Sequence, residues 1–552
     1  MEFRRLAFVV LLSGFPASAE EEPPFPSFYS SATPFRRAID ETAAVPLDPP
    51  PTGLALPHHA LAVDLIAEGL ALAKGGDYER IVIVSPDHFR RAGTPGAVAM
   101  RDFLTVLGRV PTDREASARL AADPLVSVSN LASHEHGFRA ILPLLAEWFP
   151  GTPVVTLAVG ARTTPEEWRG LAEALDPVFT EKTLLIQSTD FSHYLTPAES
   201  RARDAETLRF LALGDPDAVV DLIQPDHLDS KAAQWIQMTL QARRGSQVAV
   251  VETRNSAHYA EGREPRKTTS YITQVWRREF VPATLLPGKA WFFGGDFHLG
   301  RKLAEVAENP EATAFLDEQL LGFTGSAPLV LNLEGVLTDA LPDPASLHPM
   351  QIAMSSDVTL AWLKRWNVVG VVVANNHSLD LGEAALAAMV SRLREEGFLV
   401  VEEGATAAFP EFDLFAASDV RNHPTPAANV LRAHHFPASA DPPPAYPHRP
   451  RLAFLHWGAE YREGPDERQH WIASTARKTG FDLLIGCHSH LPSARQQVVE
   501  GILTLPSLGN LLFDQGREER GGALLEVRFF EQGTFATRVI PVGNLYLRNR
   551  RR

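Results

Sequence analysis

The sequence contains a single cysteine, Cys487, among 552 residues. One cysteine excludes an intrachain disulfide framework and any cysteine-rich zinc or iron–sulfur site. An excess of positive charge is also lacking, because 52 Lys and Arg face 67 Asp and Glu and the formal net charge is −15. That sign argues against a protein that coats nucleic acid. We therefore expect no nucleic-acid partner, and any metal site must use His, Asp, Glu or Asn.

No stretch after the N-terminus reaches the roughly 18 uncharged apolar residues that a membrane span needs. The N-terminus itself carries Arg4 and Arg5, an apolar run from Leu6 to Phe15, and the small residues Ala17-Ser18-Ala19. This order is typical of a secretory signal peptide, here residues 1–19; the alternative of a buried N-terminal helix is disfavoured by Pro16 and the glutamates that follow. We expect an exported protein, periplasmic or extracellular, without a transmembrane span.

Apolar residues make up 45% and charged residues 22% of the chain, a composition typical of folded globular proteins. At roughly 100–200 residues per domain, the chain is too long for one core. Apolar strands alternate with amphipathic helical stretches in two segments, the pattern of α/β domains. The two segments meet at a Pro- and Gly-containing stretch, residues 279–289. We therefore expect an α/β protein with domains at residues 25–278 and 290–545 and a linker between them.

In the first segment, three apolar strands are each followed by side chains that can bind metal. Ligands bind beyond the carboxyl ends of strands in open α/β sheets, so these side chains are expected to share one crevice. Imidazole and carboxylate suit iron, zinc or copper, and two histidines with one carboxylate are the usual non-haem iron(II) arrangement. The alternative is that each histidine caps a loop or satisfies a buried hydrogen bond. The residues are His58 after strand 54–57, His88 after strand 81–84, and Asp190 and His193 after strand 184–186.

Four motifs of this segment resemble the Memo family, which includes the protein B component of the AmmeMemoRadiSam system and has a fold related to class III extradiol dioxygenases. The motifs are Pro57-His58, Ser85-Pro86-Asp87-His88, Glu135-His136-Gly137-Phe138 and Ser188-Thr189-Asp190-Phe191-Ser192-His193. The resemblance implies metal contact by His58 and His88, with Asp190 and His193 beside them and His258 near a further metal position of the family. The family's Cys-Gly motif is absent around residues 229–231. We expect iron or copper in this half.

In the second segment, five strand-like runs each lead into metal-binding side chains. Asp296 and His298 flank a sharp turn and can reach the same ion, while Glu334 has two oxygens and can bridge two ions. Two ions about 3.5–4 Å apart can activate a water and stabilise the leaving oxygen of an ester, which is the logic of metal-dependent hydrolysis. The set is completed by the amide oxygen of Asn376 and by His456, His488 and His490.

His377 stands next to this predicted ligand set without belonging to it. We expect His377 to be catalytic, as a general acid or an oxyanion contact. The alternative is a sugar- or peptide-binding cleft that keeps polar residues without turnover. Cys487 also lies among the predicted ligands, but a lone cysteine in an exported domain is more often a small core residue.

The second series resembles the CapA family of capsule and poly-γ-glutamate synthesis proteins, which belongs to the calcineurin-like metallophosphoesterase superfamily. The resemblance implies a four-layer α/β fold, divalent Mn, Fe or Zn on the ligands named above, and a catalytic His377. His298 restores the Asp-x-His of true phosphoesterases, and the region from Val401 to Arg451 departs from the family. The matching stretches are Gly295-Asp296, Asn332-Leu333-Glu334, Asn375-Asn376-His377, His456-Trp457-Gly458, His488-Ser489-His490 and Ser507-Leu508-Gly509-Asn510.

These patterns together predict a metal-dependent hydrolase of capsule or envelope polymer metabolism, of the poly-γ-glutamate type. Its substrate would be an envelope or capsule polymer or a phosphoester, cleaved in the second domain. Two alternatives stay open: a non-catalytic polymer-binding or assembly factor, and a Memo-like metal-dependent redox protein. The sequence predicts no particular oligomeric state.

Overall fold

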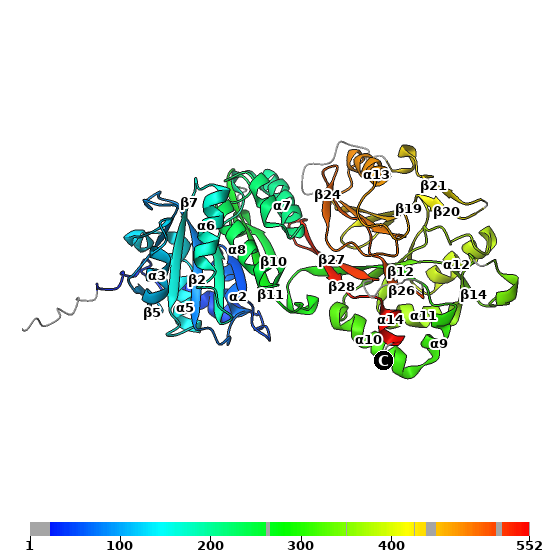
Figure 1. The fold of residues 1–552 in the computed structure, drawn as a ribbon, viewed down its shortest axis with the longest axis horizontal. Helices are drawn as coiled ribbons and strands as arrows, with labels where there is room; N and C mark the ends of the chain where they lie inside the picture. The colour runs from blue at the N-terminus through cyan, green and yellow to red at the C-terminus, as the bar shows by residue number, and fades with distance from the viewer. Residues whose placement is uncertain are drawn as a thin grey trace, which may run out of the picture.

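The structure is a computed structural model that describes residues 22–260, 265–348, 350–423, 425–437, 449–514 and 521–550. The predicted signal peptide, residues 1–19, lies outside the described residues. Figure 1 shows two bodies side by side, one built from the N-terminal half and one from the C-terminal half, each with sheets and covering helices. The expected mixed α/β class with two regions is therefore confirmed.

One nine-stranded sheet organises the N-terminal half. Its strands are β1 (Gly53–Leu56), β2 (Arg80–Asp87), β3 (Gly96–Val98), β6 (Val126–Val128), β7 (Val154–Gly160), β8 (Thr183–Ser188), β9 (His193–Leu195), β10 (Gln247–Asn255) and β11 (Thr268–Arg277). They lie in the order β10-β11-β1-β8-β2-β7-β3-β6, with β9 paired to β11. The central strands β1, β8, β2 and β7 are parallel, so their carboxyl ends share one edge. A separate hairpin joins β4 (Phe103–Thr105) to β5 (Gly108–Val110).

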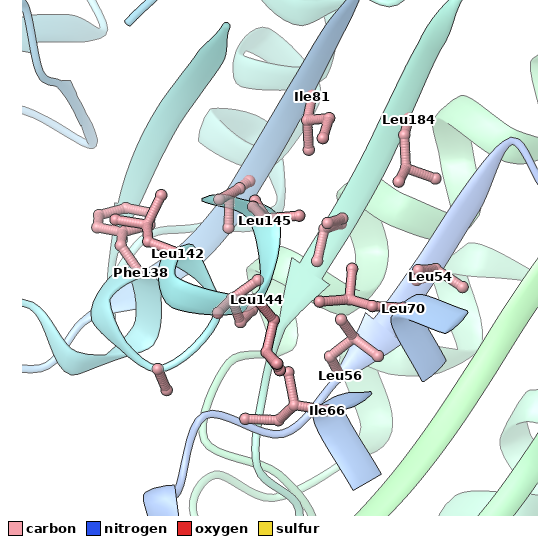
Figure 2. Packing of buried hydrophobic residues seen from close by; sticks show 14 of the residues in the cluster. Leu54, Leu56, Ile66, Leu70, Ile81, Phe138, Leu142, Leu144, Leu145 and Leu184 are labelled. Carbon is pink, nitrogen blue, oxygen red and sulfur yellow. The ribbon is translucent and has the colours of Figure 1, made fainter. Parts of the chain in front are cut away.

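Helices cover both faces of this sheet. Successive residues of β2 alternate between two cores, with Ile81 and Ile83 in one and Val82 and Val84 in the other, because side chains of a strand point to opposite faces. Figure 2 shows the first core, in which Ile66 and Leu144 pack close to the sheet. That core is covered by α1 (Thr33–Glu41), α2 (Val63–Ala71), α4 (His136–Arg139) and α5 (Leu142–Trp148), and the other by α3 (Arg114–Ala121), α6 (Pro165–Leu175), α7 (Pro197–Ala212) and α8 (Lys231–Arg243).

Two sheets form the centre of the C-terminal half. The first has the order β17-β16-β13-β12-β27-β28, with β26 paired to β12, and the second has the order β18-β19-β22-β23-β25-β24. The first consists of β12 (Lys289–Phe297), β13 (Leu329–Leu333), β16 (Val368–Val372), β17 (Leu399–Val401), β26 (Asn510–Leu512), β27 (Ala523–Phe529) and β28 (Phe535–Pro541). The second consists of β18 (Thr406–Ala408), β19 (Asp413–Ser418), β22 (Arg451–His456), β23 (Leu483–Cys487), β24 (Gln497–Val499) and β25 (Ile502–Leu505).

The two sheets face each other across one apolar core and carry helices outside, giving four layers. Phe293, Val330, Phe454 and Ile485 meet between the sheets. The first sheet is covered by α9 (Lys302–Glu308), α10 (Pro310–Thr324), α11 (Ser356–Arg365), α12 (Glu383–Glu395) and α14 (Leu545–Arg550), and the second by α13 (Glu467–Lys478). Two short ladders, β14 (Val336–Thr338) with β15 (Ala353–Ser355) and β20 (Val420–Arg421) with β21 (Ala427–Ala428), lie apart from these sheets. Among the described helices, none combines the length and apolarity that crossing a bilayer requires.

The two halves meet where α7 packs against β28 and where β10 contacts the turn between β27 and β28. Phe530 and Ala536 join the apolar cluster of the N-terminal half. The hydroxyls of Thr253 and Thr534 lie 3.0 Å apart, and the Gln532 amide donates to the Thr253 carbonyl at 3.2 Å. The last strands of the chain therefore belong to the C-terminal sheet while their turn packs on the N-terminal half.

Candidate functional site

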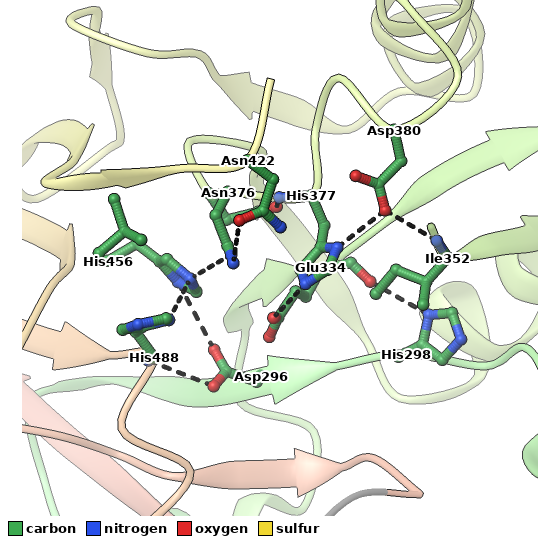
Figure 3. A network of polar contacts seen from close by, with 12 residues as sticks. Asp296, His298, Glu334, Ile352, Asn376, His377, Asp380, Asn422, His456 and His488 are labelled. Atoms are coloured by element: carbon green, nitrogen blue, oxygen red, sulfur yellow. Dashed lines mark hydrogen bonds and ion pairs between the residues drawn. The ribbon is translucent and has the colours of Figure 1, made fainter. Parts of the chain in front are cut away.

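Polar side chains gather in the C-terminal half where strands of both sheets end (Figure 3). β12, β13 and β16 are parallel neighbours in the first sheet, and β22 and β23 are parallel neighbours in the second. Parallel strands place their carboxyl ends at one edge, which brings residues from distant parts of the chain together. The gathered residues, all buried, are Asp296, Glu334, Asn376, His377, His456, His488 and His490.

Asp296 and His456 lie at the centre of this cluster. One carboxylate oxygen of Asp296 accepts from the His488 backbone N–H at 3.2 Å and lies 3.5 Å from Nδ1 of His490. Nε2 of His456 lies 2.8 Å from the amide oxygen of Asn376 and 3.0 Å from Nδ1 of His488. Ligand atoms of Asp296, Glu334 and His490 all lie within 4.8 Å of one another. The structure thus brings six of the seven predicted C-terminal ligands to one place.

The carboxyl groups of the cluster lack a cationic partner. Oε2 of Glu334 is buried and has no hydrogen-bond partner, and neither Glu334 nor Asp296 forms an ion pair with Lys or Arg among the described residues. Burial, reinforced by the charge of Asp296, raises the pKa of Glu334 well above its usual value. Burial also raises the pKa of Asp296. A buried carboxylate without a partner is costly, and a divalent cation would supply that partner.

Two histidines of the cluster, His456 and His488, are held neutral. Burial, with the neighbouring imidazoles, lowers the pKa of His456 well below its usual value and that of His488 to about 3. Neutral imidazoles offer a lone pair, which is the form that binds metal. Carboxylate, amide and neutral imidazole together match the donor set of manganese, iron or zinc. The residues present therefore fit a divalent metal centre.

The backbone that presents His488 and His490 is strained. Their φ angles are 92° and 58°, in the left-handed region that residues other than glycine seldom occupy. Such outliers gather at ligand-binding sites, where the surrounding structure holds them in place. Close packing beneath the site also demands Gly295, since a Cβ there would lie 1.9 Å from the carbonyl oxygen of Gly509. Cys487, the last residue of β23, is buried in the core between the sheets, and its Sγ lies 3.2 Å from Nδ1 of His456.

His298 differs from the expectation that it shares an ion with Asp296. Its Nδ1 faces the carbonyl oxygen of Glu334 at 3.1 Å, its ring packs on Phe513, and in Figure 3 it points away from Asp296. In a regular strand, residues two apart lie on one face, but β12 ends at Phe297, so Asp296 lies inside the strand and His298 beyond its end. Burial lowers the pKa of His298 to about 3.

His377 sits at the rim of the cluster and is oriented by a carboxylate. Its Nδ1 lies 2.8 Å from Oδ2 of Asp380, and its Nε2 lies 3.8 Å from Oε1 of Glu334. The carboxylate fixes which ring nitrogen carries a proton and directs Nε2 toward the cluster. The orienting role of Asp380 was not predicted, although its place three residues after His377 in the same loop was a usable signal.

A second cluster lies in the N-terminal half at the carboxyl ends of β1, β2 and β8. The rings of His58 and His88 are 4.8 Å apart, and the ring of His136 lies 4.0 Å from that of His88. Asp190 accepts from the His58 backbone N–H at 3.0 Å, and its other oxygen lies 3.7 Å from Nε2 of His58. The predicted residues His58, His88 and Asp190 are therefore neighbours.

Asp229 and Glu135 belong to this cluster but were not predicted as site residues. One oxygen of Asp229 lies 2.9 Å from Nε2 of His58 and 3.4 Å from Nε2 of His88. Glu135 lies 2.7 Å from Nδ1 of His88. Asp229 is delivered by pairing of its loop with the segment after β8, where its N–H donates to the Asp190 carbonyl at 3.0 Å. The signal available in the sequence was the departure from the Memo pattern at residues 229–231.

Charges in the N-terminal cluster balance one another. Burial lowers the pKa of His88, but the hydrogen bonds and charges of Asp229 and Glu135 outweigh it and raise that pKa to about 10. The pKa of His58 is also raised, because Asp190 and Asp229 together outweigh its burial. In turn, burial opposes ionisation of Asp229, but His58 and His88 hold its pKa far below the usual value. Imidazolium and carboxylate groups are thus paired inside the site.

His193 and His258 lie outside the N-terminal cluster, contrary to their predicted place in it. Nδ1 of His193 is 2.5 Å from the carbonyl oxygen of Phe191, because the chain turns into the short strand β9 at this residue. His258 is exposed on a 3-10 turn, residues Ser256–Tyr259, and packs on Tyr259. Among the described residues, the histidines near enough to share an ion in this half are His58, His88 and His136.

Comparison with known proteins finds a match to a family model in each half of the chain. Residues 53–272 match the family model of Memo-like proteins, and residues 290–422 and 451–515 match that of the bacterial capsule synthesis protein PGA_cap. The PGA biosynthesis protein CapA of Bacillus subtilis is 23% identical over 268 residues, which cover 45% of this chain and 70% of that protein. A MEMO1 family protein of Methanopyrus kandleri is 28% identical over 162 residues, which cover 28% of this chain and 56% of that protein.

Proposed function

Because the chain joins a Memo-like domain to a PGA_cap capsule synthesis domain, we propose that it is an exported, metal-dependent hydrolase of capsule or envelope polymer metabolism. The hydrolytic centre would be the C-terminal cluster. The observation that carries the proposal is the buried, unpartnered carboxylate oxygen of Glu334 among neutral imidazoles, which calls for a cation. The substrate would be a phosphoester or a bond of an envelope polymer. The domains would span residues 25–278 and 290–545.

In this proposal, six side chains hold two divalent ions of manganese, iron or zinc. When bound, such ions lower the pKa of a water and stabilise charge on the attacked ester. Asp296 and Glu334 supply the negative charge, and the strained turn of His488 and His490 fixes the imidazoles before substrate arrives. The ligands would be Asp296, Glu334, Asn376, His456, His488 and His490.

His377 would act as the general acid. For a phosphoester, the oxygen of a water forms a bond to phosphorus, and the bond from phosphorus to the leaving oxygen breaks with its electron pair on that oxygen. Nε2 of His377 gives the leaving oxygen a proton, and the proton lost by the attacking water passes to solvent. Asp380 at Nδ1 stabilises the protonated ring before transfer.

A second candidate function concerns the N-terminal half. His58, His88 and Asp229 form a set of two imidazoles and one carboxylate, which is the arrangement of non-haem iron sites. The proposal for this half is an iron or copper centre with a redox role. Of the metal positions predicted from the sequence, His58 and His88 remain in this proposal with Asp190 beside them.

The test is metal analysis of the purified full-length chain together with hydrolysis of p-nitrophenyl phosphate and bis(p-nitrophenyl) phosphate. We expect about two equivalents of metal in the C-terminal centre. Asp296→Ala combined with Glu334→Ala should remove that metal and the activity. Glu403→Gln is the matched control, since burial raises the pKa of this carboxyl as well, to about 7, but it contacts the Ser418 N–H outside the cluster.

Two outcomes would contradict hydrolysis. A native protein free of metal that still binds capsule polymer would identify an assembly factor instead. Metal content that survives the double substitution would place the ions elsewhere, and in that case His58→Ala with His88→Ala decides whether they belong to the N-terminal cluster.

A further inference from the structure

We propose that His423 is a positioning residue that aims the general acid His377 through the carboxylate of Asp380. The inference deepens the proposed hydrolysis and rests on it. The structure shows a continuous chain of side chains, His377, Asp380 and His423, in which the carboxylate is held from both sides. Figure 3 shows Asp380 above His377, on the side away from Asp296 and His488.

Asp380 is fixed by three donors. Its Oδ2 lies 2.8 Å from Nδ1 of His377 and accepts from the Ile352 backbone N–H at 2.7 Å. Its Oδ1 lies 3.0 Å from Nε2 of His423. The Asp380 side chain is fully buried, so water cannot replace a lost donor freely. Among the described residues, His423 is the only hydrogen-bond donor to Oδ1, and its removal would leave that oxygen unpaired and the carboxylate free to rotate.

His423 belongs to a part of the chain that the capsule synthesis family model does not match. That model covers residues 290–422 and resumes at residue 451. The preceding residue, Asn422, lies 3.5 Å from the amide nitrogen of Asn376. Two consecutive side chains of the turn after β20 therefore reach the centre, one at a proposed metal ligand and one at Asp380. These two side chains brace the loop that carries Asn376, His377 and Asp380.

The outer side of His423 faces a pocket of about 450 Å³. Its side chain is 34% exposed, whereas that of Asp380 is fully buried. The ring thus lies between this pocket and the buried carboxylate. His435 lines the same pocket but contacts the Arg432 backbone N–H at 2.9 Å and does not touch Asp380. Of these two pocket histidines, only His423 is coupled to the general acid.

The experiment compares two aryl esters that differ only in the leaving group, p-nitrophenyl phosphate and phenyl phosphate. The poorer phenolate leaving group needs a proton more than p-nitrophenolate does. His423→Ala should lower kcat for phenyl phosphate about 10- to 100-fold, the usual cost of losing an outer hydrogen-bond partner, and lower kcat for p-nitrophenyl phosphate far less. KM and metal content should stay unchanged. A general loss of structure would affect both esters alike.

Two further variants complete the test. His423→Gln keeps an N–H that can donate to Asp380, so it should restore most of the phenyl phosphate rate. His435→Ala changes the same pocket without touching Asp380 and should behave like the wild type. Equal losses on both esters in His423→Ala, or no loss on either, would overturn the inference.

A measurement that needs no turnover separates this inference from the proposed function. The proton on Nδ1 of His377, bonded to the Asp380 carboxylate, should give a downfield resonance in spectra of the 15N-histidine-labelled, zinc-loaded full chain, assigned by its loss in His377→Gln. It should move in His423→Ala and return in His423→Gln. If the wild type hydrolyses neither ester, hydrolysis fails, while a resonance unmoved by His423→Ala overturns the positioning role.

Discussion

The two polar clusters of this chain balance their charges in opposite ways. In the N-terminal cluster, the pKa of His88 is raised to about 10 and that of Asp229 is lowered, so charged partners face each other. In the C-terminal cluster, the pKa of Glu334 is raised and that of His456 is lowered, so both groups are driven to their neutral forms. Similar residue types at similar sheet edges therefore make two electrostatically different sites.

This difference in pKa shifts indicates which of the two sites would gain a missing positive charge from an added cation. Paired buried charges compensate part of their desolvation cost, whereas an unpaired buried carboxylate neutralises or recruits a cation. In the N-terminal cluster, His58 and His88 are paired with carboxylates of the cluster itself, and a metal entering it would have to displace protons from these two histidines. The C-terminal cluster offers neutral nitrogen lone pairs and carboxyls that have no Lys or Arg partner among the described residues, and a divalent ion would supply that partner.

Removal of the central carboxylate should give the largest contrast. Asp229→Ala would leave His58 and His88 facing each other without their counter-charge, and we expect a loss of about 3 kcal/mol in the free energy of unfolding. Asp296→Ala in metal-free protein should cost much less, because it removes a carboxyl group that burial already disfavours. Both losses can be measured by urea unfolding of each variant, followed by hydrogen exchange in peptides from each half. Equal losses would show that the clusters do not differ in this way.

Addition of metal should stabilise the C-terminal half. Manganese at about 100 times its Kd should stabilise the C-terminal half by about 2.7 kcal/mol, since it binds the folded form alone. A chelator should reverse the gain. Hydrogen exchange of β12, β22 and β23 with and without metal reports it, and peptides of β1, β2 and β8 serve as the internal reference. Greater protection of the N-terminal strands at the same concentration would reverse the assignment of the two sites.

Much of the fold could be predicted from the sequence, because its buried strands appear as continuous apolar runs. The continuous apolar run 81–84 became the buried centre of β2, and the run 368–373 became β16. Parallel strands buried on both faces need such runs, so the pattern is imposed by burial. The packing of Phe530 on the N-terminal half could not be foreseen, because that contact depends on a surface formed by residues far earlier in the chain.

The sequence could predict site residues only where the end of a strand determines their position. Glu334 directly follows β13, His456 ends β22 and Asn376 lies in the loop after β16, so the topology that gathers the strands gathers these side chains. The strand pattern did not report that His298 lies just past the end of β12, where its Nδ1 faces the carbonyl oxygen of Glu334 and not Asp296. Asp229 was missed because it reaches His58 from a loop before α8, through a contact between segments about 170 residues apart in the sequence.

Alkaline pH should weaken the N-terminal cluster. The pKa of His88 is raised from its usual value near 6.5 to about 10, so its pairing stabilises the fold fully below pH 6.5 and is lost as pH rises toward 10. We expect a loss on the order of 2 kcal/mol over that window. Asp229 acts in the opposite sense, with its contribution lost as the solution becomes strongly acidic. The unfolding free energy of wild type and His88→Gln should converge as pH increases, and a constant difference would contradict the pairing.

The smallest effects should come from the histidines that the sequence placed in the N-terminal cluster and the structure places outside it. His193 contacts its own local backbone and His258 is exposed, so His193→Ala and His258→Ala should each change the unfolding free energy by no more than about 0.5 kcal/mol. Iron or copper titration of these variants should match the wild type, whereas His58→Ala should lose binding. A loss of metal in His258→Ala would mean that the turn at residues 256–259 closes over the cluster when an ion binds. The pairing of imidazolium and carboxylate groups described for this site would then hold for the metal-free form alone.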